Sequence, residues 1–235
     1  MQIRKFEDKI YEELKKNKLF IFKIKDLCLL LKINETKAYN IIKSLKRKQI
    51  IKKTGKNFFV FNESNEFIIG QSIHYPSYLS FWSALNYYGF SDQTPKVIFF
   101  ATTKYSQRIN NFKYVTISKK RFFGYTRIGE LIIAEKEKAI IDSLLFPKYS
   151  GGLKEIAYSL QSGLKEIDVE KLINYGFNVE SKAVLRRLGF ILDELHYKKE
   201  LKKIKENIGK GYELLDPNLK RKNNLNKKWL LDINW

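Results

Sequence analysis

Hydrogen-bond-donating side chains are dense between residues 36 and 56, and nine of them are candidates for contacts with a ligand. Side chains of these types donate hydrogen bonds to the phosphates of nucleic acids. Asn40 and Arg47 could also pair, through two hydrogen bonds each, with the edges of adenine and guanine in a major groove. The chemistry predicted for this segment is recognition of double-stranded DNA, and the candidate contact residues are Thr36, Lys37, Asn40, Lys43, Ser44, Arg47, Lys52, Lys53 and Lys56.

A short amphipathic helix is needed to present the first six of these residues. Asn34 is a good N-cap, because its side chain can accept a hydrogen bond from an amide of the first turn. Apolar residues then recur with the spacing of one buried stripe, at Ala38, Ile41, Ile42 and Leu45. At roughly 100° per residue, the opposite face carries Thr36, Asn40, Lys43 and Arg47, with Lys37 and Ser44 beside them.

A basic hairpin is predicted directly after this helix. Residues 50–53 and 57–61 read as two strands joined by a Thr54-Gly55-Lys56 turn, in which Gly55 can adopt a positive φ. The tip of the hairpin then carries three lysines, Lys52, Lys53 and Lys56.

Two further helices upstream would complete a small core, and residues 19–22 could add a third strand. Their apolar stripes are Ile3, Phe6, Ile10 and Leu14 in the first helix and Ile24, Leu27, Cys28 and Leu31 in the second. A lysine-rich helix alone could simply be a solvated face. The order helix, helix, turn, helix, basic hairpin favours a winged helix-turn-helix DNA-binding domain in residues 1–62.

The positive charge is concentrated where this motif lies. The chain has 45 Lys and Arg and 25 Asp and Glu, a net charge of +20. Residues 1–62 hold 17 basic and 6 acidic residues, which gives +11, and residues 197–235 hold 11 and 5, which gives +6. A polyanion is the natural partner, because each neutralised phosphate releases counterions.

Other functional classes have little support in the composition. No apolar run approaches the roughly 18 residues of a membrane span, so we expect a cytoplasmic protein without a membrane partner. Cys28 is the single cysteine and His74 and His196 are the only histidines, too few for a zinc site of the usual kind. We expect no metal and no cofactor.

Residues 63–235 are expected to form a second domain of the α+β class, after the polar residues 62–65. A helix is predicted over 77–90, then strands over 96–101, 112–117, 122–128 and 131–133. Helices follow over 134–145, 153–162, 168–174, 179–195 and 197–208. The predicted fold is a winged helix-turn-helix followed by a small β-sheet and a C-terminal helical bundle.

Catalytic patterns are weak. Asp168 with Glu180-Ser181-Lys182 matches a loose metal-dependent nuclease pattern, but both pieces fall in helical sequence, whereas that chemistry is expected on a sheet. Residues 135–138, which alternate Glu and Lys, are expected to be a solvated helical face rather than acid–base machinery. Phosphate-binding loops and nucleotidyltransferase patterns are absent from the sequence. We therefore expect a protein that is not an enzyme.

Several apolar and basic residues could serve an interface. Most aromatics of residues 75–90 have helical spacing typical of a core, whereas Phe81 and Tyr87 fall off the buried side of the predicted helix. Leu29 and Leu30 lie off the stripe of the second helix and could pack on another surface. Residues 220–228 are basic and could contact phosphates or form a solvated tail, and Trp229 and Trp235 indicate that part of this tail docks on the protein.

Five stretches of the chain carry motifs in the order and spacing of one known family: residues 78–102 (YLSFWSALNYYG with Gln93, Pro95 and Ala101-Thr102), 133–152 (IAEKEKAIID with Pro147 and Gly151-Gly152), Arg187 to Leu192, Leu215-Asp216-Pro217 and Trp229 to Asn234. Together these stretches resemble the AbiEi-type antitoxins, a family of predicted transcriptional regulators of viral defence systems. One departure is Glu135-Lys136, where the family usually has Asp and Pro, a variation that affects how a helix is capped.

The resemblance implies a DNA-binding repressor and antitoxin of a type IV toxin–antitoxin system. Such a protein represses its own operon through the winged helix, at an operator upstream, and counteracts a nucleotidyltransferase-like toxin through its C-terminal domain. A homodimer on DNA is compatible with this expectation. Two alternatives stay open: a protein-interaction module that neutralises a toxin with weak DNA binding, and a metal-dependent nuclease.

Overall fold

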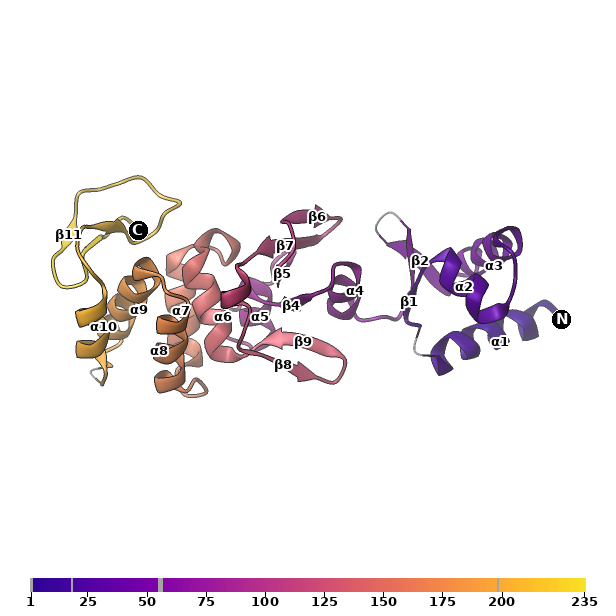
Figure 1. Ribbon diagram of the computed structural model, residues 1–235, viewed down its shortest axis with the longest axis horizontal. Helices are drawn as coiled ribbons and strands as arrows, with labels where there is room; N and C mark the ends of the chain where they lie inside the picture. The colour runs from indigo at the N-terminus through magenta and orange to yellow at the C-terminus, as the bar shows by residue number, and fades with distance from the viewer. Residues whose placement is uncertain (1, 18, 55–56, 198) are drawn as a thin grey trace. The chain divides into compact units, whose positions relative to one another are not determined.

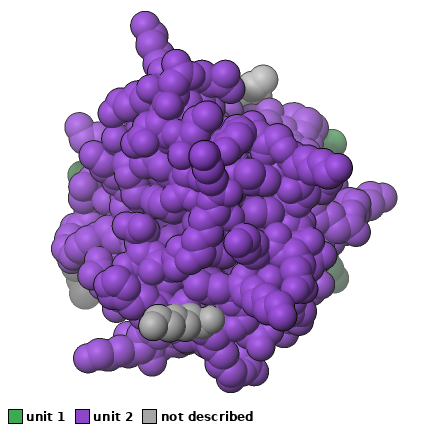
Figure 2. All heavy atoms as spheres, turned by 90° about the vertical axis from the view of Figure 1, so that its left-hand side faces the viewer, with its two compact units in different colours: residues 1–75 green, residues 76–235 purple. Residues whose placement is uncertain are grey.

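The chain is mixed α/β and forms two compact units, residues 1–75 and 76–235, coloured separately in Figure 2. The computed structural model describes residues 2–17, 19–54, 57–197 and 199–235, with side chains from Phe6 onward (Figure 1). The observed mixture of helices with several small sheets agrees in outline with the predicted fold class.

The first unit contains three helices, a three-stranded antiparallel sheet and a fourth helix at its end. The strand predicted within residues 19–22 is present and pairs with the second strand of the hairpin, Phe22 opposite Phe59. In chain order the elements are α1 (Gln2–Lys16), β1 (Ile21–Phe22), α2 (Ile24–Leu31), α3 (Glu35–Arg47), β2 (Ile51–Thr54), β3 (Phe58–Phe61) and α4 (Glu66–Ile73).

Among the side chains that the structure describes, which do not include that of Ile3, the core of the first unit follows the predicted stripes with one correction. Phe6 was expected on the buried stripe of α1, but 58% of its surface is exposed, and Glu7 is buried instead. Glu7 lies on the same face of the helix as the buried residues Ile10 and Leu14, so its side chain points toward the core. Core residues of this unit are Ile10, Leu14, Phe22, Leu27, Ala38, Ile42, Leu45, Ile51, Phe59 and Phe61.

The polar stretch at residues 62–65 is folded against the first unit, whereas the sequence placed a domain boundary there. Asn62 donates a hydrogen bond of 2.5 Å to the Gln49 carbonyl, and Asn65 accepts one of 2.8 Å from the Phe67 amide as the N-cap of α4. The two compact units divide after Tyr75, so α4 belongs to the first unit.

The second unit combines a six-stranded mixed sheet with a set of helices. Its strands lie in the order β6-β7-β5-β4-β9-β8, with parallel pairing of β5 with β7 and of β4 with β9. The elements are β4 (Ser77–Leu79), α5 (Phe81–Tyr87), β5 (Ile98–Thr102), β6 (Gln107–Ile109), β7 (Phe112–Thr116), a 3₁₀ turn (Lys119–Arg121), β8 (Tyr125–Ile128), β9 (Leu131–Ala134), α6 (Lys136–Leu145), a 3₁₀ turn (Pro147–Tyr149), α7 (Leu153–Gly163), α8 (Val169–Asn178), α9 (Lys182–Glu194) and α10 (Leu201–Asn207).

The single helix predicted over residues 77–90 is wrong at its start. Ser77–Leu79 form β4, which pairs with β5 on one side and β9 on the other, and α5 begins at Phe81. All three residues of β4 are buried. Tertiary pairing within the sheet therefore overrides a local pattern that also fits a helix.

Helix α6 is the centre of the second unit, in contact with α5, α7, α8 and α9 (Figure 1). It is buried along its length from Glu137 to Leu144. A small sheet of β10 (Glu213–Leu214), β11 (Leu225–Asn226) and β12 (Leu231–Asp232) ends the chain, in the order β10-β12-β11. No helix in the described part of the chain is long and apolar enough to cross a membrane.

Candidate functional site

Helix α3 presents its polar side chains as the sequence predicts. The Asn34 side chain accepts a hydrogen bond of 2.9 Å from the Lys37 amide, which fixes the start of the helix. Ala38, Ile42 and Leu45 are buried on the core side. On the other side lies a set of exposed residues that we name the α3 polar face: Thr36, Lys37, Asn40, Lys43 and Arg47.

Ser44 differs from the other predicted contacts, because its hydroxyl is engaged within the protein. It donates a hydrogen bond of 2.5 Å to Glu7 of α1, and Lys48 forms an ion pair with the same carboxylate. These donors, Lys48 first and then Ser44, hold the pKa of Glu7 below its ordinary value. Sequence reasoning missed Glu7, although its place in line with Ile10 and Leu14 was a signal of burial.

The side chains of Lys52 and Lys53 lie on opposite faces of strand β2. Lys53 lies opposite Phe59, which belongs with Ile51 and Phe61 to the core cluster of the first unit, whereas Lys52 lies opposite Val60, which is buried outside that cluster. Because side chains alternate along a strand, Lys53 shares the face directed to the core and Lys52 takes the other face. Both lysines are exposed. Lys56, the third predicted contact of the hairpin, lies outside the described residues.

A groove of about 320 Å³ lies beside α3, between the start of α2 and the hairpin. Tyr39 projects there with 61% of its surface exposed, and Lys23 lies 4.8 Å from the ring centre of Phe58. Sequence reasoning missed Tyr39, Lys23 and Lys25. The signal for Tyr39 was its position as an aromatic residue outside the apolar stripe of α3. The residues that line the groove are Lys23, Ile24, Lys25, Glu35, Tyr39, Lys53, Asn57 and Phe59.

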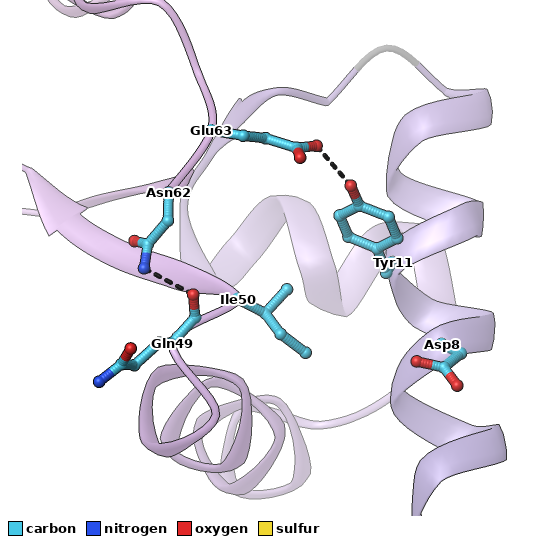
Figure 3. A pocket seen from close by; sticks show the side chains of 6 residues that line it. All are labelled: Asp8, Tyr11, Gln49, Ile50, Asn62 and Glu63. Atoms are coloured by element: carbon cyan, nitrogen blue, oxygen red, sulfur yellow. Dashed lines mark hydrogen bonds between the residues drawn. The ribbon is translucent and has the colours of Figure 1, made fainter.

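A second, more polar pocket lies where the hairpin ends against α1 (Figure 3). The Tyr11 hydroxyl donates to Glu63, and the Lys15 ammonium lies 3.1 Å from the same carboxylate. Both interactions lower the pKa of Glu63, and the hydrogen bond from Tyr11 lowers it more than the contact with Lys15. Within this pocket Tyr11 bonds to Glu63 and Asn62 bonds to Gln49, and the first of these bonds ties the segment after β3 to α1.

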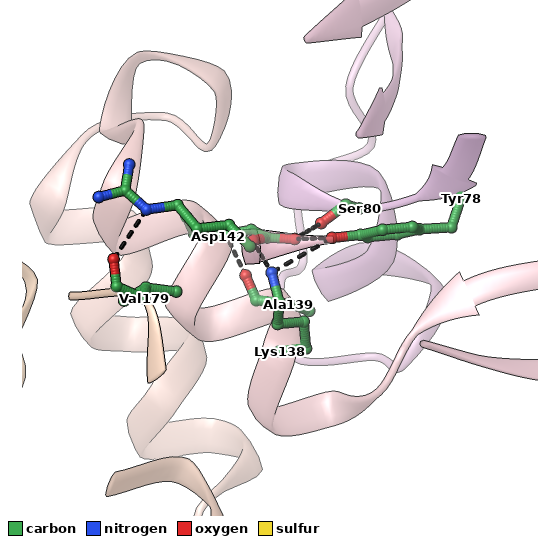
Figure 4. Close-up of polar contacts among 8 residues, drawn as sticks. Tyr78, Ser80, Lys138, Ala139, Asp142 and Val179 are labelled. Atoms are coloured by element: carbon green, nitrogen blue, oxygen red, sulfur yellow. Dashed lines mark hydrogen bonds and ion pairs between the residues drawn. The ribbon is translucent and has the colours of Figure 1, made fainter. Parts of the chain in front are cut away.

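The second unit contains a buried cluster of four polar residues that we name the α6–β4 cluster (Figure 4). Asp142 accepts hydrogen bonds from the Tyr78 hydroxyl at 2.9 Å and from the Ser80 hydroxyl at 2.8 Å. Lys138, one turn earlier on α6, forms an ion pair with Asp142 and lies 3.2 Å from the Tyr78 oxygen. Desolvation, followed by the Asp142 charge, raises the pKa of Tyr78 well above its ordinary value.

The α6–β4 cluster is closed to solvent, since all four side chains have 0% exposure. Buried charge is tolerated when it is paired and hydrogen-bonded, as it is here. The arrangement therefore fixes α6 against β4 and offers no surface at which a substrate could meet Lys138. Tyr78 also packs on Phe122 and Tyr125, with ring centres 5.0 and 5.2 Å away.

The expectation of a solvated face over residues 135–138 is wrong. Glu137 and Lys138 are buried, with 5% and 0% exposure. Glu137 accepts a hydrogen bond of 3.0 Å from the Asp168 amide, and Lys171 lies 3.2 Å from Glu135 and 3.3 Å from Glu137. Charge alternation in the sequence misleads here because partners on α8, and Asp142 one turn later, neutralise these side chains.

The acidic residues of the loose nuclease pattern, Asp168 and Glu180, have other structural roles. Asp168 is the N-cap of α8 and accepts a hydrogen bond of 3.1 Å from the Lys171 amide. Glu180 forms an ion pair with Lys120. Among the described residues, no group of three or more His, Cys, Asp or Glu side chains is arranged to hold a metal ion.

Of the proposed interface aromatics, one is buried and one is not. Phe81 is fully buried at the start of α5, with φ of 55°, so its prediction as an exposed residue is wrong. Tyr87 is 39% exposed. Leu29 is 78% exposed on α2, whereas Leu30 packs against the core of the first unit.

The C-terminal segment docks on the second unit, as the two tryptophans indicate. Trp229 is fully buried, and its indole N–H donates a hydrogen bond of 2.9 Å to Asp193 of α9. Trp235 packs on Phe190 with ring centres 5.6 Å apart. Part of the basic stretch is paired, since Lys228 lies 2.7 Å from Asp193 and Arg221 lies 3.6 Å from Asp232.

Comparison with known proteins supports the fold. No protein-family model matches the chain, and no curated protein matches its sequence. Among solved structures, the chain is similar to the RV2827C protein from Mycobacterium tuberculosis, with a TM-score of 0.68 and 12% sequence identity. The similarity covers 93% of this chain and 87% of that protein, and at this identity it shows that the two share a fold.

Proposed function

We propose that the first unit is a winged helix-turn-helix that binds double-stranded DNA. The observation that carries the proposal is the exposed α3 polar face beside a basic hairpin. The arrangement of α2, a short turn, α3 and a three-stranded sheet also supports it. Cations and amides on one exposed helix face suit a major groove, and a lysine-bearing hairpin suits the neighbouring phosphates.

The chemistry of the proposed contact residues favours different roles for them. Asn40 and Arg47 have side chains that can read base edges, whereas Thr36, Lys37 and Lys43 suit phosphates. In the hairpin we keep Lys53, which shares the core-directed face of the sheet, and the predicted contact Lys56. Lys52 is left out of the proposed contacts because it lies on the opposite face of β2. Ser44 is assigned to support α3 through Glu7.

Binding to the duplex upstream of its own gene, compared with a random duplex at moderate salt, tests this proposal. Asn40→Ala or Arg47→Ala should weaken specific binding by about 1–3 kcal/mol and relax base preference. Lys56→Ala should weaken binding to every duplex and flatten the salt dependence. If the wild-type protein does not distinguish its own upstream DNA from random duplex, the proposal of a sequence-specific repressor fails.

For the whole chain, we propose a repressor and antitoxin of the type IV class, with the second unit counteracting a nucleotidyltransferase-like toxin. The resemblance to AbiEi-type antitoxins supports this, and Lys138 and Asp142 of one resembling stretch lie in the core of the second unit. Co-expression with a neighbouring toxin gene is the test. Rescue of growth by residues 76–235 alone would favour an interaction module with little need of DNA, and no rescue by the full chain would count against an antitoxin role.

A further inference from the structure

The groove beside α3 has the charge of an anion site. Three lysines, Lys23, Lys25 and Lys53, line it together with one carboxylate, Glu35. They come from three different parts of the fold: the entry to α2, the first turn of α2 and strand β2. The remaining lining includes the rings of Tyr39 and Phe59. An elongated ligand with negative charge and an apolar part fits this lining better than a free ion.

Tyr39 makes the groove continuous with the α3 polar face. On a helix surface, residues three and four apart are neighbours, so Tyr39 lies next to Thr36 and Lys43. At roughly 100° per residue, Tyr39 lies on one side of the face and Ser44 on the other, where α1 covers the helix through Glu7. The groove is therefore the open flank of the face proposed to enter the major groove.

We propose that this groove binds the sugar–phosphate backbone of one DNA strand, with the lysines around a phosphate and the Tyr39 ring against a deoxyribose. The assignment rests on the proposed DNA-binding function and adds contact residues to it. A backbone is favoured over a base because the groove flanks the polar face of α3 and its donors are ammonium groups, which fix position without reading sequence. Glu35 opposes binding, so the site holds phosphate less tightly than three lysines alone would.

Neighbouring lysines in β2 provide a matched test. The full-length protein is titrated with random-sequence duplex over a range of salt concentrations. Lys53→Ala should lower the affinity and reduce the slope of log K against log salt by about 0.9, the contribution of one phosphate. Lys52→Ala, the adjacent residue on the opposite face of the same strand, should leave the slope unchanged. Equal effects of the two substitutions would overturn the proposal.

The ring and the carboxylate provide independent tests. Tyr39→Ala should weaken binding to all duplexes, whereas Leu29→Ala, another exposed apolar side chain, should not. Glu35→Gln should strengthen binding, because it removes a like charge from the phosphate site. The opposite result for Glu35, or no effect of Tyr39→Ala, would overturn the groove assignment.

These outcomes are separable from failure of the proposed function. If Asn40→Ala and Arg47→Ala weaken specific binding while the groove variants behave as their controls, α3 binds DNA and the groove does not. If wild-type protein does not bind duplex at all, both proposals fail.

Discussion

Lys138 and Asp142 lie one turn apart on α6 and form an ion pair from which solvent is entirely excluded. The hydroxyls of Tyr78 and Ser80 also donate hydrogen bonds to the Asp142 carboxylate, so every charge in the cluster has a partner. The Tyr78 hydrogen bond to this pair joins the central helix of the second unit to β4, a strand in the middle of its sheet.

Removal of one partner of this pair should destabilise the second unit strongly. Asp142→Asn leaves a buried ammonium without its counter-charge, and we expect a loss of about 3–5 kcal/mol in the free energy of unfolding. All three tryptophans, Trp82, Trp229 and Trp235, belong to the second unit, so urea unfolding followed by tryptophan fluorescence reports on it.

Two controls separate buried charge from loss of packing. The double variant Lys138→Met with Asp142→Leu removes both charges and should be less destabilising than Asp142→Asn alone. Glu180→Gln, which breaks the exposed pair with Lys120, should change stability little. A double variant that unfolds more easily than the single one would show that the ion pair itself stabilises the unit.

Acid should loosen α1 through Glu7. Its pKa is held below the ordinary value of 4.5 by Lys48 and Ser44, so the charged form is favoured in the folded state. The stability that Glu7 contributes is complete above pH 4.5 and is lost as the pH falls through the lowered pKa. Hydrogen exchange measured by mass spectrometry on α1 peptides should show this loss of protection.

The matched control for Glu7 is on the same helix. Glu7→Gln should reduce the acid-dependent loss of protection in α1, whereas Glu12→Gln, at an exposed position, should leave it as in the wild type. The same pH dependence in all three proteins would exclude Glu7 as its source.

Helical periodicity predicts most of the elements, but it does not reveal which polar residues are buried. Asn34, the apolar stripe of α3 and the hairpin strands are local features, and the structure agrees with them. Glu7 can be buried because Ser44 and Lys48, which lie far from it in the sequence, bind its carboxylate. Lys138 can be buried because Asp142, one turn later on the same helix, pairs with its charge.

The α3 polar face was accessible to sequence reasoning, but the groove was not. Each residue of the face follows from the 3.6-residue repeat of a single helix. Lys23, Tyr39 and Lys53 come together only when the start of α2, the side of α3 and strand β2 are packed. Similarly, the opposite directions of Lys52 and Lys53 depend on the register of β2 with β3, which a lysine pair in a sequence does not specify.

Arg187 should be intolerant of replacement by lysine. The residue is 5% exposed, and its guanidinium donates to the carbonyls of Leu144, Leu215 and Leu214, at 2.9, 3.0 and 3.3 Å. An ammonium cannot reproduce this spread of donors, so Arg187→Lys should lower the free energy of unfolding by about 1–3 kcal/mol. Arg108→Lys, at an exposed position in β6, is the control and should have little effect in the same urea titration.

Gly189 is needed for the docking of Trp229. A Cβ atom added at Gly189 would lie 2.1 Å from the Trp229 ring, far inside contact distance, and a buried indole cannot move aside as a flexible chain can. We expect Gly189→Ala to cost about 1–3 kcal/mol and to shift the tryptophan emission as Trp229 is displaced. Gly176→Ala in α8 is the matched control, since its nearest neighbour is a Leu188 methyl at 3.2 Å. Equal stability of the two variants, with unchanged emission, would show that the C-terminal segment adapts to the added methyl without leaving α9.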